Sequence, residues 1–114
     1  MPGPSTYSIG NIKGSWVLSP TLSPVSVGVT TTTEQTFTVT GLILGDFVDV
    51  AKPTNQPGLS VANSRVSAAN TLAITFVNLS SATITPTASE IYNIVVTRPE
   101  NLTSTNNSIL TQLV

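Results

Sequence analysis

The stretch GLSVANSRVSAANTLAITFVN, residues 58–78, decides the fold class of this 114-residue chain. Leu72, Ile74 and Phe76 alternate with Ala, Thr and Val, which is the period of two that a β-strand requires. The preceding residues 59–66 can form another strand, and Ala68-Ala69-Asn70 is short enough to be a tight connection between the two. The stretch therefore predicts two neighbouring β-strands.

Strand patterns continue on both sides of this stretch. Residues 91–97 are apolar on both faces, with Tyr92, Ile94 and Val96 on one of them, which is typical of a central strand or of one covered by a partner. A helical period of useful length is not found. Further strands are predicted at residues 25–29, 36–40 and 47–50, a short one at 82–84 ends before Pro86, and residues 52–58 form a loop. About seven short strands at this spacing predict an all-β fold, an antiparallel β-sandwich or jelly-roll-like domain.

The N-terminal region, residues 1–24, is rich in proline and glycine, which disfavour a helix or a long central strand. We predict an extended N-terminal arm here, followed by the β-sandwich domain at residues 25–98. The arm either orders on a partner's surface or folds over its own domain. Its apolar side chains are candidate protein-interface residues: Tyr7, Ile9, Ile12, Trp16 and Leu18.

Residues 99–114 form a predicted C-terminal tail, which is polar and rich in Asn and Thr but has an apolar tip. Leu110 and Leu113 in that tip are the remaining candidate interface residues. The tip either docks on a neighbouring subunit or, in the isolated protein, stays disordered.

The composition excludes several kinds of chemistry. Cysteine and histidine are absent, so the chain has no disulfide, no thiolate and none of the commonest general base. Charged residues make up 8% of the chain and the net charge is −1, whereas an average soluble domain carries about 25% charged residues. Such a surface suits permanent contact with other subunits, although a Thr/Ser-rich extracellular β-domain is the alternative. The four basic residues are spread out, and no apolar run is long enough to span a membrane, so we expect neither nucleic acid nor membrane as a partner.

The acidic residues do not suggest a catalytic pair. Asp46 and Asp49 are three residues apart near a strand start, so they should point to opposite faces. We expect both to be solvent-facing aspartates beside a turn. Glu34 and Glu90 stand at predicted strand starts, where a solvated charge is usual. We therefore predict no enzyme activity, no catalytic residue, no metal site and no cofactor. Three Asn-x-Ser/Thr triplets, at Asn78, Asn101 and Asn106, are interpreted as products of the composition.

Four segments carry a resemblance to a known family: EQTFTVTGL (34–42), GDFVDVAKP (45–53), the stretch 58–78 quoted above and EIYNIVVTR (90–98). Together they resemble the small head decoration, or cement, proteins of tailed bacteriophages. Those proteins often carry a charged residue in the turn after TGL, where this chain has Ile43 and Leu44. The resemblance implies a viral structural protein that binds the outer surface of an assembled capsid, with the major capsid protein as partner. It further implies a homotrimer located in the virion.

The start of the chain, MPGPSTYSIG, lacks the pattern of a signal peptide, so we expect synthesis in the host cytoplasm. Two other functions compete with capsid decoration. The first is another virion component, such as a tail or head-fibre knob, or an immunoglobulin-like module that binds carbohydrate through Tyr7, Trp16 or Tyr92. The second is a small hydrolase, which the missing histidine disfavours.

Overall fold

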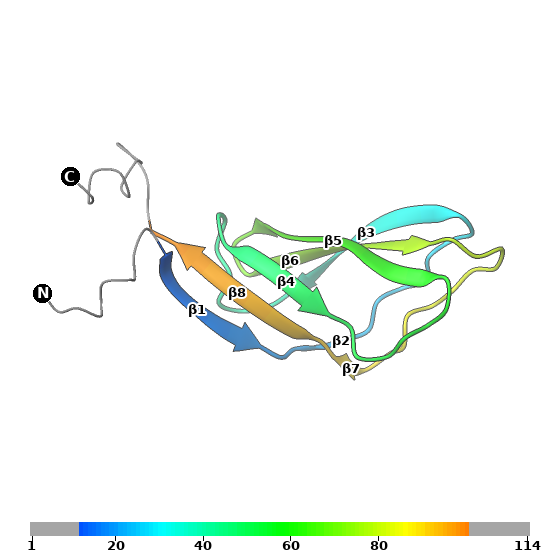
Figure 1. Ribbon diagram of the computed structural model, residues 1–114, viewed down its shortest axis with the longest axis horizontal. Coiled ribbons are helices and arrows are strands. Elements are labelled where there is room, and N and C mark those ends of the chain that lie inside the picture. The colour runs from blue at the N-terminus through cyan, green and yellow to red at the C-terminus, as the bar shows by residue number, and fades with distance from the viewer. Residues whose placement is uncertain (1–11, 101–114) are drawn as a thin grey trace, which may run out of the picture.

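Antiparallel strands make up the part of the chain that the computed structural model describes, residues 12–100 (Figure 1). No helix occurs among these residues, so the predicted all-β class is confirmed. The strands are β1 (Ile12–Leu18), β2 (Thr21–Leu22), β3 (Thr31–Thr38), β4 (Phe47–Ala51), β5 (Leu59–Ala68), β6 (Thr71–Asn78), β7 (Glu90–Ile91) and β8 (Asn93–Pro99).

Two three-stranded sheets form the sandwich, and a short ladder extends it. The first sheet has the order β1-β8-β4 and the second has the order β3-β6-β5, while β2 pairs with β7. Strand β8 is thus a central strand, as its apolar character on both faces predicted. Because β1 begins opposite the end of β8, with Ile12 paired to Pro99, both ends of the described chain lie at one end of the domain (Figure 1).

Residues 59–78 form the β5–β6 hairpin. Ala68 pairs with Thr71, so the connection consists of Ala69 and Asn70. Asn70 has a φ of 56°, in the left-handed region that asparagine tolerates better than most residues. The backbone amide of Asn70 also donates to the Leu42 carbonyl at 2.8 Å, which connects the turn to the loop between β3 and β4.

The core lies between the inner faces of the two three-stranded sheets. From β8 come Ile94 and Val96, with Tyr92 directly before them, and all three are fully buried. The facing strand β6 contributes Leu72, Ile74 and Phe76, which are two residues apart as the period of two predicted, and Ala73 between them is buried as well. The other buried hydrophobic residues of this cluster are Leu22, Val27, Val39, Leu42, Leu59 and Val66.

The predicted arm is only partly separate from the domain. Residues 12–24 belong to the fold, since β1 pairs with β8 and β2 pairs with β7, so the boundary predicted after residue 24 is placed too late. The prolines allow this because Pro20 and Pro24 follow β1 and β2 rather than interrupting them. Residues 1–11 of the predicted arm and 101–114 of the predicted tail lie outside the described residues.

The strand predicted at residues 25–29 is wrong. Only Val27 forms a bridge, with Ile84, and Val25 and Val29 are exposed. The backbone of Val25 forms its hydrogen bonds with the side chain of Gln35 instead of with another strand. The Val25 amide donates to Gln35 Oε1 at 2.8 Å, and Gln35 Nε2 donates to the Val25 carbonyl at 2.9 Å. The strand predicted at 82–84 is reduced to the same single bridge.

Candidate protein-interaction site

The interface residues predicted from the sequence are dispersed. Trp16 and Leu18 are partly buried and pack against the domain's own core, which fits the alternative in which this segment folds over its own domain. Ile12 is exposed at the start of β1. The other four, Tyr7, Ile9, Leu110 and Leu113, lie outside the described residues.

Trp16 takes part in a polar cluster around Arg98. The guanidinium carbon of Arg98 lies 4.8 Å from the centre of the Trp16 ring, a cation–π geometry. Nε and Nη2 of Arg98 donate to the two carboxylate oxygens of Asp46, each at 2.8 Å, and Nη2 also donates to the Gly41 carbonyl at 2.8 Å. One side chain therefore connects β8, β1 and the loop between β3 and β4.

Asp46 is buried, which contradicts the expectation that it faces solvent. Besides Arg98, its carboxylate accepts a hydrogen bond of 3.0 Å from the Ile43 amide. The hydrogen bonds from Arg98 are the largest influence on the Asp46 carboxyl and, helped by the Ile43 amide, they lower its pKa although burial opposes this. The carboxylate thus holds the β3–β4 turn in place.

Glu90 is also buried rather than solvated. Lys52 Nζ lies 3.3 Å from Glu90 Oε1, and the same ammonium donates to the Thr54 carbonyl at 2.7 Å. The neighbouring Tyr92 hydroxyl has no hydrogen-bond partner among residues 12–100. Burial, followed by the nearby Glu90 carboxylate, raises the pKa of Tyr92 to about 12. The ion pairs of Asp46 and Glu90 each connect residues that are distant in the sequence, and the position of these acids at strand starts did not predict that role.

The third acid with a basic partner among the described residues, Glu34, lies on the outside of the β3-β6-β5 sheet. Its carboxylate accepts bonds of 2.8 and 3.0 Å from Arg65, which lower the pKa of Glu34 and raise that of Arg65. Asn78, the first residue of one Asn-x-Ser/Thr triplet, is fully buried. Its amide donates to two backbone carbonyls and accepts from Ser80, so it is engaged in the fold rather than presented at the surface.

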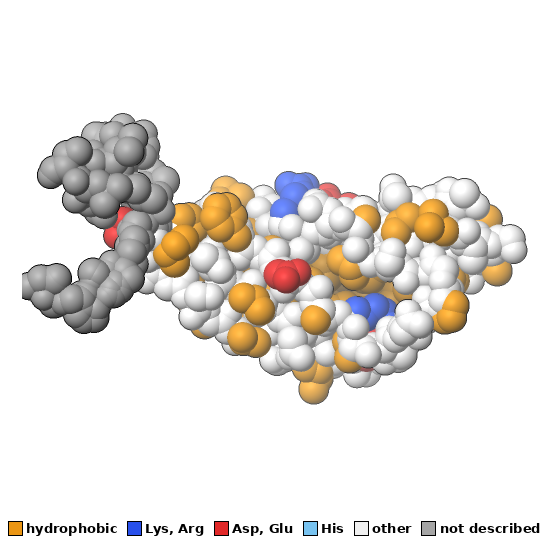
Figure 2. Space-filling view, in the orientation of Figure 1, with side chains coloured by type: hydrophobic (Ala, Val, Ile, Leu, Met, Phe, Trp, Pro, Cys, Tyr) orange, Lys and Arg blue, Asp and Glu red, His pale blue; other side chains and the backbone are white. Residues whose placement is uncertain are grey.

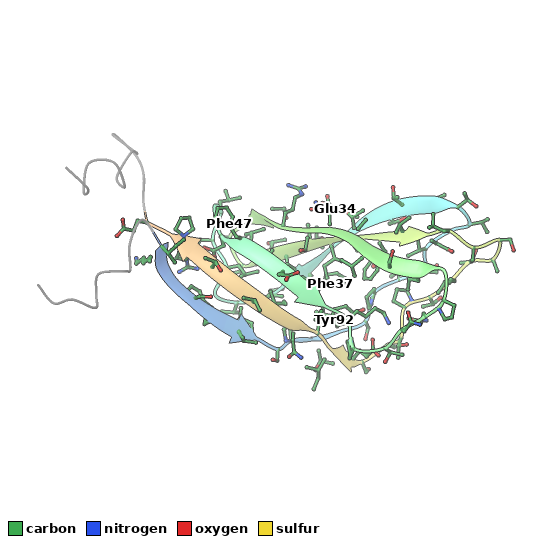
Figure 3. The ribbon with its side chains drawn as sticks, viewed as in Figure 1. Glu34, Phe37, Phe47 and Tyr92 are labelled. Carbon is green, nitrogen blue, oxygen red and sulfur yellow. The ribbon has the colours of Figure 1, made fainter. Side chains whose placement is uncertain are left out.

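The outer face of the β1-β8-β4 sheet carries exposed apolar side chains, and we call it the sheet face. Val17 and Val95 are paired across β1 and β8 and are 59% and 44% exposed, while Phe47 on β4 is 63% exposed. Thr97 pairs with Phe47, Asp49 pairs with Val95, and Ser15 pairs with Thr97, so the sheet face holds one charge among these six residues. Figure 3 shows Phe47 at the start of β4 and Tyr92 near the opposite end of the same sheet.

A second exposed apolar area adjoins the sheet face, at the end of the domain where residues 12 and 100 lie. Ile43 and Leu44 project from the β3–β4 turn and are 46% and 65% exposed. They border a pocket of about 460 Å³, whose other lining residues are Lys13, Gly45, Asp46, Arg98, Pro99 and Glu100. We call this feature the end pocket. Figure 2 shows several hydrophobic side chains gathered at this end.

Part of these surfaces can be predicted from the sequence. The apolar character of β8 on both faces points to Val95, and the turn after TGL has Ile43 and Leu44 in place of a charged residue. Val17 and Phe47 were missed, because an alternating pattern does not tell which face of an edge strand looks outward.

Within residues 12–100, the structure contains no group of three or more acidic side chains able to hold a metal ion. The same residues include no helix long and apolar enough to cross a membrane. Comparisons with protein-family models, with curated proteins and with solved structures found no match to this chain.

Proposed function

We propose that this chain is a structural protein of a bacteriophage virion that binds the outer surface of the assembled capsid and stabilises it. The proposed partner is the major capsid protein, and the proposed assembly is a homotrimer without enzyme activity. The sheet face is the observation that carries this proposal. An exposed area of apolar side chains with few charges is the kind of surface that marks a protein–protein contact.

The resemblance of four segments to capsid decoration proteins supports the same function. Three of those segments supply β4, β6 and β8, the strands that carry the sheet face and the core beneath it. A trimer on a capsid would also make several modest contacts at once, so that each contact raises the effective concentration of the next.

The carbohydrate-binding alternative depends on aromatic side chains that are open to solvent. Tyr92 is fully buried, and Trp16 is partly buried beneath Arg98. Two of the three aromatic candidates named for sugar binding are therefore not open to solvent, and the third, Tyr7, lies outside the described residues.

The proposal is tested by cosedimentation of the purified chain with capsids of the phage that encodes it, prepared without this protein. The wild-type chain should sediment with them, and Val95→Asp, which places a charge in the centre of the sheet face, should weaken binding at least about tenfold, as expected at an interface centre. Val25→Asp is the matched control, because Val25 is the same residue type and is also exposed, 65% against 44% for Val95, but lies outside this sheet. If the wild-type chain stays in the supernatant, or if both variants bind equally well, the proposed interface is wrong.

A further inference from the structure

The end pocket is a built feature of the fold rather than a frayed loop end. Asp46 accepts a hydrogen bond from the Ile43 amide, and the Ile43 carbonyl accepts one of 3.1 Å from the Asp46 amide. Arg98 fixes both Asp46 and the Gly41 carbonyl on the other side of the turn. The turn is therefore held so that Ile43 and Leu44 stay exposed at the rim of the pocket.

The charges at the pocket are largely balanced. Arg98 is neutralised by Asp46, and Lys13 and Glu100 carry opposite charges. A balanced lining with an apolar rim favours an uncharged, apolar occupant over an ion. Its volume of about 460 Å³ is enough for a few aliphatic side chains.

The chain itself supplies such an occupant close by. Glu100 lines the pocket, and the segment that follows it in sequence reaches a cluster of apolar residues after eight intervening residues, NLTSTNNS at 101–108. Residues 109–114 read ILTQLV, with four apolar residues among six and no charge. We call residues 109–114 the apolar tip.

The spacer has a suitable length for the apolar tip to return to the pocket. A flexible chain of eight residues has a root-mean-square span of about 16 Å, and its fully extended length is about 26 Å. At such a separation the effective concentration of the tip at the pocket is on the order of 1 mM. A contact with a dissociation constant of about 0.1 mM would then be occupied about 90% of the time.

We infer that the apolar tip, residues 109–114, docks into the end pocket of its own chain and covers Ile43 and Leu44. Residues 1–11 are a poorer occupant, because their large apolar side chains, Met1, Tyr7 and Ile9, are fewer and are spread over nine positions. This inference concerns a contact within one chain and does not depend on the proposed capsid function.

Methyl NMR on the full-length chain tests the inference. Contacts should appear as nuclear Overhauser effects between the methyl groups of Leu44 and those of Leu110 or Leu113. A soluble paramagnetic agent should relax the Leu44 methyls several-fold less in the wild-type chain than in the double variant Leu110→Asp/Leu113→Asp. The Leu79 methyls are the internal control, because Leu79 is exposed next to the other end of β6 and should respond equally in both proteins.

A mixture of isotope-labelled and unlabelled chains separates the two ways in which the tip could dock. Effects that arise only between labelled and unlabelled chains would show that the tip of a second copy fills the pocket, and they would overturn docking within one chain. The inference is equally overturned if Leu44 shows no contact with the tip and is relaxed to the same extent in both proteins. Leu44→Asp, at an exposed turn position, should abolish the same contacts from the pocket side.

Discussion

Replacing Asp46 with asparagine should destabilise the domain strongly, because it leaves the Arg98 guanidinium without its counter-charge. The Asp46 side chain is fully buried, and that of Arg98 is 21% exposed. Asparagine keeps the shape of the side chain and one acceptor oxygen, which can still receive the Ile43 amide. The substitution therefore tests the charge pair and leaves the packing nearly unchanged.

The expected magnitude follows from the two charge-assisted hydrogen bonds of 2.8 Å. Removing one partner of a buried ion pair costs about 3–5 kcal/mol. Arg98 retains the Gly41 carbonyl, Trp16 and some contact with water, so we expect a loss of about 2–4 kcal/mol for Asp46→Asn. That is a large fraction of the 5–15 kcal/mol typical of a folded domain.

Urea unfolding followed by the fluorescence of Trp16, the only tryptophan in the chain, measures this loss. Combining Asp46→Asn with Arg98→Met, which keeps an unbranched stem against Trp16, should reveal a coupling energy of about 2 kcal/mol in a double-mutant cycle. Asp49→Asn is the matched control on the exposed sheet face and should change stability by no more than about 0.5 kcal/mol. A loss below that value for Asp46→Asn, with additive effects in the cycle, would refute the reasoning.

The same pair predicts how stability depends on acidity. The pKa of Asp46 lies below its ordinary value of 3.8, so its contribution is complete above pH 3.8 and is lost as the pH falls through the lowered pKa. Glu34 also has a lowered pKa and adds to the loss in the same acid range. The difference in stability between the wild type and Asp46→Asn isolates Asp46, and it should shrink as the pH falls below 3.8.

Three further predictions concern the core and its turns. Tyr92→Phe should leave stability unchanged or raise it by up to about 1 kcal/mol, because it removes a buried hydroxyl that has no partner among the described residues. In urea unfolding, the wild type should lose stability as the pH rises from 10 to about 12, and the variant should not show this loss. Gly58→Ala should cost about 1–3 kcal/mol more than Gly45→Ala in the same assay: both glycines have positive φ, but only at Gly58 would the new Cβ lie 2.9 Å from Ser80 Cβ, and equal losses would contradict this. Asn78→Ala should cost about 2–4 kcal/mol in thermal or urea unfolding, because two carbonyls and Ser80 lose their buried partner; a change under about 0.5 kcal/mol would contradict the burial of its amide.

The sequence predicted the parts of the fold in which alternation is strong and local. The core faces of β6 and β8 follow from the period of two, because residues two apart in a strand share a face whatever the neighbouring strands are. A tight connection at Ala68-Ala69-Asn70 is predicted for a similarly local reason, and the structure narrows it to Ala69-Asn70 because Ala68 pairs with Thr71.

Several features were decided only by contacts between distant residues. Residues 25–29 have the alternation of a strand, but the backbone of Val25 is hydrogen-bonded to the side chain of Gln35. Residues 12–18 form a strand because they pair with β8. Burial of Asp46 depends on Arg98, 52 residues away in the chain, and no local pattern records such a pairing.

Taken alone, the amino-acid sequence determined the all-β class, the absence of histidine and cysteine side chains, and the low content of charged residues. Tertiary structure alone decided where Val17, Val95 and Phe47 come together, and that Ile43 and Leu44 stand exposed at a braced turn. The physical reason is that alternation assigns side chains to two faces of a strand, whereas only the packing of the two sheets decides which face becomes the core and which remains a surface.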